Sequence, residues 1–207
     1  MGKDFFLKTV IGICGVVWVA SLVLAGTVPA SRALFAPFSL VVSIAGGIVW
    51  IFDRWSWSWP LVRLLVKRPD LRGTWKGAIA SEWVSPQTNA RLAPIPTFVV
   101  VTQTATSIHV RQLTDESESI TLAAAIVDDA DDAHSVVGVY RNEPQSRVRD
   151  KSPIHLGALR LRVGGADELG GDYWTDRNSR GQLTLKRISK KKAKSLADAQ
   201  KLAAKAP

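Results

Sequence analysis

The chain has 207 residues, of which 27 are Lys or Arg and 18 are Asp or Glu, so the formal net charge is +9. From Lys186 onward eight basic residues and one acidic residue give +7, which leaves +2 for everything before. This distribution excludes a generally basic domain that would coat DNA or RNA. The single cysteine, Cys14, excludes a disulfide framework and a cysteine-based zinc site within one chain.

Two long apolar runs open the chain. No charged residue lies between Thr9 and Ser31, and none lies between Arg32 and Asp53. Each run is about as long as the ~20 apolar residues that a helix needs to cross a bilayer. We predict a first transmembrane helix and an external turn over residues 1–32, and a second transmembrane helix with an interfacial linker over residues 33–68. A cleaved signal peptide is the alternative for the first run, but the run is longer than an ordinary h-region of ~7–15 residues.

Basic residues lie before the first apolar run and after the second, that is, at the open end of the helical hairpin that the two runs predict. Lys3 and Lys8 precede the first run, a further group follows the second run, and the turn between them carries only Arg32. The positive-inside rule therefore predicts that both ends of the hairpin, and the domain that follows, are cytoplasmic. Four indole rings cluster where the second run ends and predict an aromatic belt at the headgroup level: Trp50, Trp55, Trp57 and Trp59.

Small residues recur every fourth position on the second run, at Ser39, Ser43 and Gly47. This spacing lets another helix approach closely. The partner is either the first helix of the same chain or a helix of another subunit.

The composition changes after Leu71. Short segments rich in Val, Ile, Thr, Leu and aromatic residues alternate with turn-forming clusters, which is typical of antiparallel strands. We predict eight strands: Thr74–Trp83, Thr97–Thr104, Ser107–Leu113, Ser119–Val127, His134–Arg141, His155–Val163, Leu169–Thr175 and Gln182–Ile188.

The predicted fold is therefore a membrane-anchored all-β protein. Residues 69–189 form a small eight-stranded antiparallel up-and-down β-barrel, with an open sandwich as the alternative. Residues 190–207 form a Lys-rich tail. Beside a membrane such a tail favours anionic headgroups, and a solvated, disordered tail is the other interpretation.

Catalytic patterns are missing from the sequence. His109, His134 and His155 are scattered, and no nucleophile elbow, His-Glu-x-x-His pair or phosphate-binding glycine loop occurs. The Asp128–Asp132 cluster lacks the spacing of a calcium loop. We predict neither an enzyme nor a metal site, and no cofactor.

The sequence does contain residues of the kinds that bind nucleotides. Flat rings can stack on bases, and guanidinium groups can hold phosphates in bidentate fashion. The segment from Asn142 to Pro153 is the longest connection between predicted strands and carries Arg147 and Arg149. The candidate ligand-binding residues are Trp75, Tyr140, Arg141, Arg147, Arg149, Tyr173, Thr175 and Arg177. The aromatic members are also suitable as barrel core, and the arginines as a solvated rim.

Three short motifs carry a resemblance to a known family. They are Leu71-Arg72-Gly73-Thr74-Trp75-Lys76-Gly77, Tyr140-Arg141-Asn142-Glu143-Pro144 and Gly171-Asp172-Tyr173-Trp174-Thr175-Asp176-Arg177. Together with two apolar N-terminal helices, they make the chain similar to the two-transmembrane β-barrel effectors associated with CD-NTases in bacterial CBASS anti-phage systems, which are STING-like cyclic dinucleotide receptors. The similarity covers nearly the whole chain except the Lys-rich tail.

The resemblance implies an inner-membrane receptor whose barrel binds a cyclic dinucleotide as its activating ligand. Binding would promote homo-oligomerisation, disruption of the bilayer and abortive infection. DNA and RNA are not expected partners. The alternatives from the residues are a lipocalin-like anchored barrel that binds a lipid in envelope maintenance, and a plain membrane scaffold with a protein-binding barrel.

Overall fold

The computed structural model describes residues 3–24, 38–65, 68–84, 89–129, 133–165 and 167–206. The chain divides into two compact units, Met1–Arg68 and Pro69–Pro207. Each unit is described by itself.

The first unit is helical. It contains α1 (Lys3–Leu24), α2 (Phe38–Arg54), the 3-10 turn η2 (Ser56–Ser58) and α3 (Pro60–Leu65). Helices α1 and α2 pack against each other, and the side chains of Val41 and Ala45 on α2 are buried. In the part of the chain that the structure describes, no helix combines the length and the apolarity that crossing a bilayer requires. Residues 25–37, which include Arg32 and the predicted external turn, lie outside the described residues.

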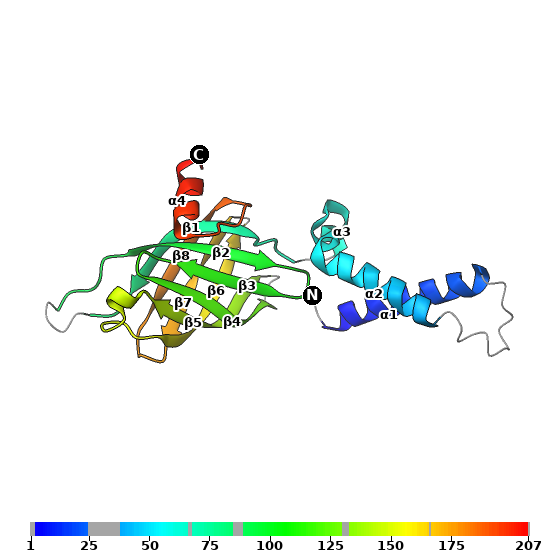
Figure 1. Ribbon diagram of the computed structural model, residues 1–207, viewed down its shortest axis with the longest axis horizontal. Coiled ribbons are helices and arrows are strands. Elements are labelled where there is room, and N and C mark those ends of the chain that lie inside the picture. The colour runs from blue at the N-terminus through cyan, green and yellow to red at the C-terminus, as the bar shows by residue number, and fades with distance from the viewer. Residues whose placement is uncertain are drawn as a thin grey trace. The chain divides into compact units, whose positions relative to one another are not determined.

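The second unit is a closed antiparallel barrel in which each strand pairs with the next and β8 pairs with β1 (Figure 1). Its strands are β1 (Gly73–Ser81), β2 (Ile95–Gln103), β3 (Ile108–Leu113), β4 (Ser117–Asp128), β5 (His134–Pro144), β6 (His155–Gly165), β7 (Glu168–Thr175) and β8 (Arg180–Ser189). The prediction of an eight-stranded up-and-down barrel is confirmed.

Burial alternates along the strands, which explains why the alternating sequence pattern predicted them. On β6, Leu159 and Leu161 are buried in the core while Arg160 and Arg162 face solvent, as expected for a period of two. The core is filled by branched aliphatic side chains from most strands, together with Trp75 and Tyr140. β5 continues to Pro144, so the connection to β6 begins at Gln145 rather than at Asn142.

One end of the barrel is closed by Trp75 and its neighbours. The Trp75 side chain is fully buried, and its Nε1 donates to the Leu71 carbonyl at 3.0 Å. The Arg187 guanidinium lies 5.1 Å from the centre of the Trp75 ring and donates to the Asp70 carbonyl. Gln103 holds the entering chain by accepting from Leu71 N and donating to Pro69 O.

Charges also surround Asp70 at this closed end. Burial alone would raise the pKa of Asp70. The hydrogen bond from Arg72 and the charges of Arg72 and Arg187 outweigh burial, so the pKa lies below its ordinary value. The carboxylate therefore stays ionised and helps to fix the chain where it enters β1.

The C-terminal tail is ordered, in contrast to the disordered alternative. Helix α4 (Leu196–Ala204) begins at the N-cap Ser195, whose side chain accepts from Asp198 N. Apolar residues of the tail pack on the outer faces of Phe98, Val100 and Leu113. Thr74 Oγ1 donates to Lys191 O, and Arg111 Nη2 donates to Ala193 O. The apolar residues of the tail therefore form a face that packs on the barrel, although the high lysine content of the tail gives no indication of it.

Candidate functional site

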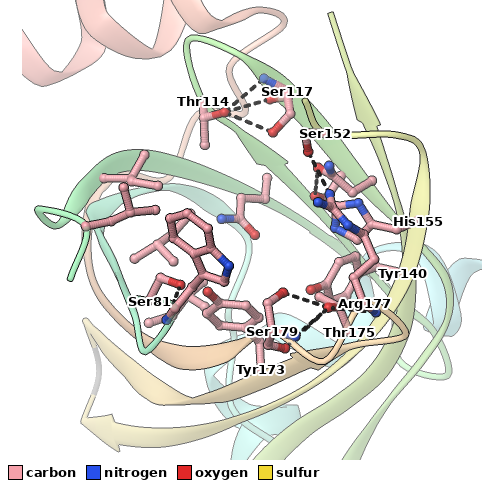
Figure 2. A pocket seen from close by; sticks show the side chains of 18 of the residues that line it. Ser81, Thr114, Ser117, Tyr140, Ser152, His155, Tyr173, Thr175, Arg177 and Ser179 are labelled. Atoms are coloured by element: carbon pink, nitrogen blue, oxygen red, sulfur yellow. Dashed lines mark hydrogen bonds between the residues drawn. The ribbon is translucent and has the colours of Figure 1, made fainter. Parts of the chain in front are cut away.

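A cavity of about 340 Å³ lies at one end of the barrel (Figure 2). Ile79 and Ser81 at the end of β1 line it, whereas Trp75 near the start of β1 does not. The cavity lies where β1 ends and β2 begins, and where the turns after β3, β5 and β7 converge. Its lining residues are Ile79, Ser81, Trp83, Leu92, Ile95, Gln112, Thr114, Ser117, Ser119, Tyr140, Asn142, Lys151, Ser152, His155, Tyr173, Thr175, Arg177, Ser179 and Leu183.

The wall of the cavity contains a row of polar side chains on neighbouring strands. Gln112 pairs in register with Ser119, Ser119 with Asn142, and Asn142 with His155. All four line the cavity, and the Ser119 hydroxyl donates to Asn142 Oδ1 at 2.8 Å. Polar groups inside a barrel are costly unless they bond to one another, to water or to a ligand, so this row indicates a site rather than a core layer.

The two tyrosines of the chain both face this cavity. Tyr140 on β5 is 7% exposed, and Tyr173 on β7 is partly buried. Gly157 makes room for the Tyr140 ring, because a Cβ at residue 157 would lie 2.3 Å from Tyr140 Cζ. Burial, with smaller contributions from Tyr173 and Asp176, raises the pKa of Tyr140 above the range of an ordinary phenol.

This raised pKa predicts a pH dependence of stability. The folded state holds the Tyr140 proton more tightly than the unfolded state, so the stabilisation is complete below the unfolded pKa of about 10 and is lost as the pH rises above it. We expect the urea midpoint of the full-length protein to fall more steeply between about pH 10 and 11 than that of Tyr140→Phe. Parallel declines in the two proteins would contradict the raised pKa.

The rim of the cavity is cationic. Lys151 and Arg177 line it and are exposed, and no Asp or Glu is among the described residues of the lining. Arg177 Nη1 donates to Ser152 Oγ at 3.0 Å, which holds the guanidinium beside the segment after β5 (Figure 2). A cavity with two basic side chains at its rim and no carboxylate among its described lining residues favours an anionic ligand.

Hydroxyl-capped turns fix the rim. Thr175 Oγ1 bonds the Ser179 hydroxyl at 2.7 Å and accepts from Arg177 N. The Thr114 and Ser117 hydroxyls make the same kind of bond at 3.0 Å across the turn between β3 and β4. Within the described residues, no group of three or more His, Cys, Asp or Glu side chains is arranged to hold a metal ion.

Four of the predicted ligand-binding residues meet in this cavity: Tyr140, Tyr173, Thr175 and Arg177. They come from β5, β7 and the turn after β7, and the barrel closure brings them together.

The other four predicted residues lie elsewhere. Trp75 is a core residue at the opposite end, so its side chain presents no free face for a base. Arg141 follows Tyr140 on the strand and so points outward, where it pairs with Glu143 at 3.1 Å. Arg147 donates to Asp115 O, and Arg149 donates to Pro144 O, both outside the cavity.

Sequence reasoning missed the polar row and several rim residues. Gln112 and Ser119 are inward positions of predicted strands, and a polar residue at an inward position was the available indication. Asn142 was placed in the connection after the fifth predicted strand, whereas the structure includes it in β5. Lys151 and Ser152 lie in the long connection that the sequence did single out. Trp83 and Leu92 belong to the β1–β2 connection, which no motif marked.

Fold and site together define a class of protein, namely a small closed β-barrel with a ligand-sized, cation-rimmed cavity at one end. The model of the family described as "Cap15, cyclic dinucleotide receptor domain" matches residues 66–187. The chain therefore belongs to this family of cyclic dinucleotide receptor domains.

A curated relative agrees with this membership. The CD-NTase-associated protein 15 of Staphylococcus schleiferi is 26% identical over 150 residues, which cover 72% of this chain and 78% of that protein. The predicted relationship to CD-NTase-associated CBASS effectors is confirmed.

Proposed function

We propose that this protein is a membrane-anchored CBASS effector that binds a cyclic dinucleotide in the barrel cavity. Binding would then drive homo-oligomerisation and disruption of the bacterial inner membrane. The observation that carries the proposal is a cavity with Lys151 and Arg177 at its rim and no carboxylate among its described lining residues, inside the domain that the family model matches. The effector would need no cofactor and catalyse no reaction.

The cavity offers each part of a cyclic dinucleotide a suitable partner. Lys151 and Arg177 would contact the phosphates, because charge-assisted hydrogen bonds to a guanidinium or ammonium group are the strong ones. The rings of Tyr173 and Tyr140 would contact the bases, at about 1–3 kcal/mol per stacked base.

Membrane anchoring is supported by the helical unit. The two uncharged runs extend into residues outside the described ranges. On α1 and α2, large apolar side chains such as Val16, Val23 and Val42 are more than half exposed. Trp50, Trp55 and Trp59 are likewise exposed near the end of α2, as expected for a belt at the headgroup level. Trp57, the fourth predicted member of the belt, is instead fully buried. We place the protein in the inner membrane as a multi-pass protein with both termini cytoplasmic.

Oligomerisation is supported by the small-residue face of α2. Ser39, Ser43 and Gly47 are exposed, and a Cβ added at Gly47 would meet no atom within 4 Å. The face that packs within the unit instead carries Val41 and Ala45. A ligand that binds the assembled state about 100-fold more tightly than the monomer shifts the assembly equilibrium by just under 3 kcal/mol. Confinement to a membrane favours assembly further, because it raises the effective concentration of the subunits.

The binding step can be tested with the full-length protein in detergent. Isothermal titration calorimetry with a panel of cyclic dinucleotides should show micromolar or tighter binding of at least one, and weaker binding of the corresponding linear dinucleotide. The absence of heat with every cyclic dinucleotide at high micromolar concentration would refute the proposal.

The membrane step needs its own assay. The protein reconstituted in dye-loaded vesicles should release dye after addition of the ligand found by calorimetry, and not before. Ligand binding without dye release would retain the receptor and reject membrane disruption.

The lipid-binding alternative requires a deep apolar lumen. The described barrel interior is instead filled by the buried cluster that includes Trp75, Leu161 and Leu185, and the cavity at the mouth is lined by polar side chains as well as apolar ones. No observation therefore favours an apolar ligand over an anionic one.

A further inference from the structure

A histidine and an arginine lie beside each other on the wall of the cavity. Asp176 N donates to Leu156 O at 3.0 Å, which extends the antiparallel pairing of β6 with β7 beyond the last strand residues. The next position on each side is occupied by His155 and by Arg177. Both side chains line the cavity, and Figure 2 shows them on the same side of it. Side chains in opposite positions of an antiparallel pair are close enough to interact.

The imidazole ring of His155 is oriented by its own segment. Its Nδ1 bonds the Pro153 carbonyl oxygen at 3.0 Å, and a carbonyl oxygen only accepts, so Nδ1 carries a hydrogen. In the neutral ring Nε2 is then an acceptor. The two ring nitrogens point away from each other, and Nε2 makes no hydrogen bond to the described residues. Nε2 is therefore available to a ligand, and it becomes a donor only when the ring gains a second proton.

The charged groups around the ring determine when it gains that proton. Lys151 and Arg177 line the cavity with His155. Asp150 and Asp176 belong to the same two connections but do not line it, and the Asp176 carboxylate accepts from a backbone N–H of β6. Like charges in opposite positions repel each other. A protonated ring beside the guanidinium is therefore unfavourable until an anion lies between them.

The other neighbours of the ring offer polar groups without a charge near neutral pH. Asn142 of β5 pairs with His155 in register and is uncharged. Burial raises the pKa of Tyr140, on the same strand, so its phenol stays protonated. Tyr173 and Thr175 of β7 contribute hydroxyl groups, and the lining residues of β3 and β4 contribute hydroxyl and amide groups. An anionic ligand is therefore the group that would stabilise a positive charge on the ring.

We propose that His155 is a phosphate-binding residue that takes up a proton when the ligand binds. This inference rests on the proposed function of the same cavity. In the neutral ring Nε2 presents a lone pair, which a phosphate oxygen repels. Imidazole is the side chain that changes charge between about pH 5 and 8, so a proton from the solvent converts Nε2 into a charge-assisted donor beside Arg177. Because the bound state holds more protons than the free state, affinity should rise as the pH falls.

Calorimetry on the full-length protein in detergent tests this proton uptake. The probes are cyclic di-GMP, cyclic di-AMP and cyclic di-UMP, whose phosphodiester groups stay charged throughout. The tightest of them is titrated in PIPES and in Tris at the same pH and salt concentration, because the two buffers release a proton with different heats. We expect a difference in heat that corresponds to proton uptake. We also expect affinity to be about three-fold or more higher at about pH 6.5 than at about pH 8.

Two substitutions separate proton uptake from a structural role. His155→Gln cannot ionise, so its binding heat should be the same in both buffers and its affinity the same at both pH values. His155→Lys is charged at both pH values, so it should bind at about pH 8 as tightly as the wild-type protein does at about pH 6.5, without proton uptake. His109→Gln is the matched control, because His109 is exposed on β3 and does not line the cavity. Its proton uptake should equal that of the wild type.

The outcomes separate this inference from the proposed function. Binding with the same heat in both buffers, or equal proton uptake by His155→Gln and the wild type, would overturn the role of His155 and leave the receptor function standing. If none of the three ligands binds the wild-type protein, this inference is overturned, and failure of the wider panel would remove the receptor function with it.

Discussion

Replacing Arg177 by Gln is expected to weaken binding of a cyclic dinucleotide by about 10- to 100-fold, because a hydrogen bond to a charged group contributes about 1.5–3 kcal/mol. Arg177 lines the cavity, and its Nη1 donates to Ser152 Oγ, so the guanidinium is held before the ligand arrives. The measurement is calorimetry on the full-length protein in detergent, with the tightest ligand of the panel. Raising the salt concentration should reduce the difference between variant and wild type.

Arg141→Gln is the matched control for this experiment. Arg141 has the same charge and lies next to Tyr140, but it points to the outer face and pairs with Glu143. We expect its substitution to change the dissociation constant by less than about two-fold, because exposed ion pairs contribute little. Equal losses in Arg177→Gln and Arg141→Gln would mean that ligand is held outside the cavity.

Replacing Trp75 by Ala is expected to lower the free energy of unfolding by about 3–5 kcal/mol, which is typical of a buried Trp replaced by Ala. The substitution empties the closed end of the barrel and removes the hydrogen bond from Trp75 Nε1 to Leu71 O. It also takes away the ring beneath the Arg187 guanidinium. Urea unfolding, followed by near-ultraviolet circular dichroism of the full-length protein in detergent, measures the loss.

Trp75→Phe distinguishes a core role from a stacking role. The smaller ring should cost less stability than alanine, and ligand affinity measured well below the unfolding transition should stay within about two-fold of wild type. A large loss of affinity in a folded Trp75→Phe protein would restore Trp75 to the ligand site.

The barrel was predictable because each of its strands has one face in the hydrophobic core and one face in solvent. A strand such as β6 alternates Leu159 and Leu161 with Arg160 and Arg162, and eight such segments without helices between them admit few topologies. The strand ends were less predictable. Asn142 and Pro144 look like loop residues, yet cross-strand pairing with Ser119 and Ser117 keeps them in β5.

The site was only half predictable for a related reason. Composition indicated that aromatic rings and arginines are candidate ligand-binding residues. Whether such a side chain points into the barrel or outward depends on its parity, that is, on whether its position along the strand is odd or even. That parity separates Tyr140, which faces the cavity, from Arg141, which does not. Trp75 faces inward, but at the other end of the barrel, and strand position alone does not show which end is hollow. The disordered interpretation of the tail was wrong because the high lysine content hid Ala193 and Ala199, which are buried beside β2 and β3.

The Trp75 plug makes the barrel blind-ended. A ligand that enters at the rim cannot pass the buried Trp75 ring and the Arg187 guanidinium that lies over it. It must therefore leave through the same opening. It also cannot touch the chain where that chain enters β1. A ligand in the cavity therefore influences the residues that lead into β1 only through the strands and the packed core of the barrel.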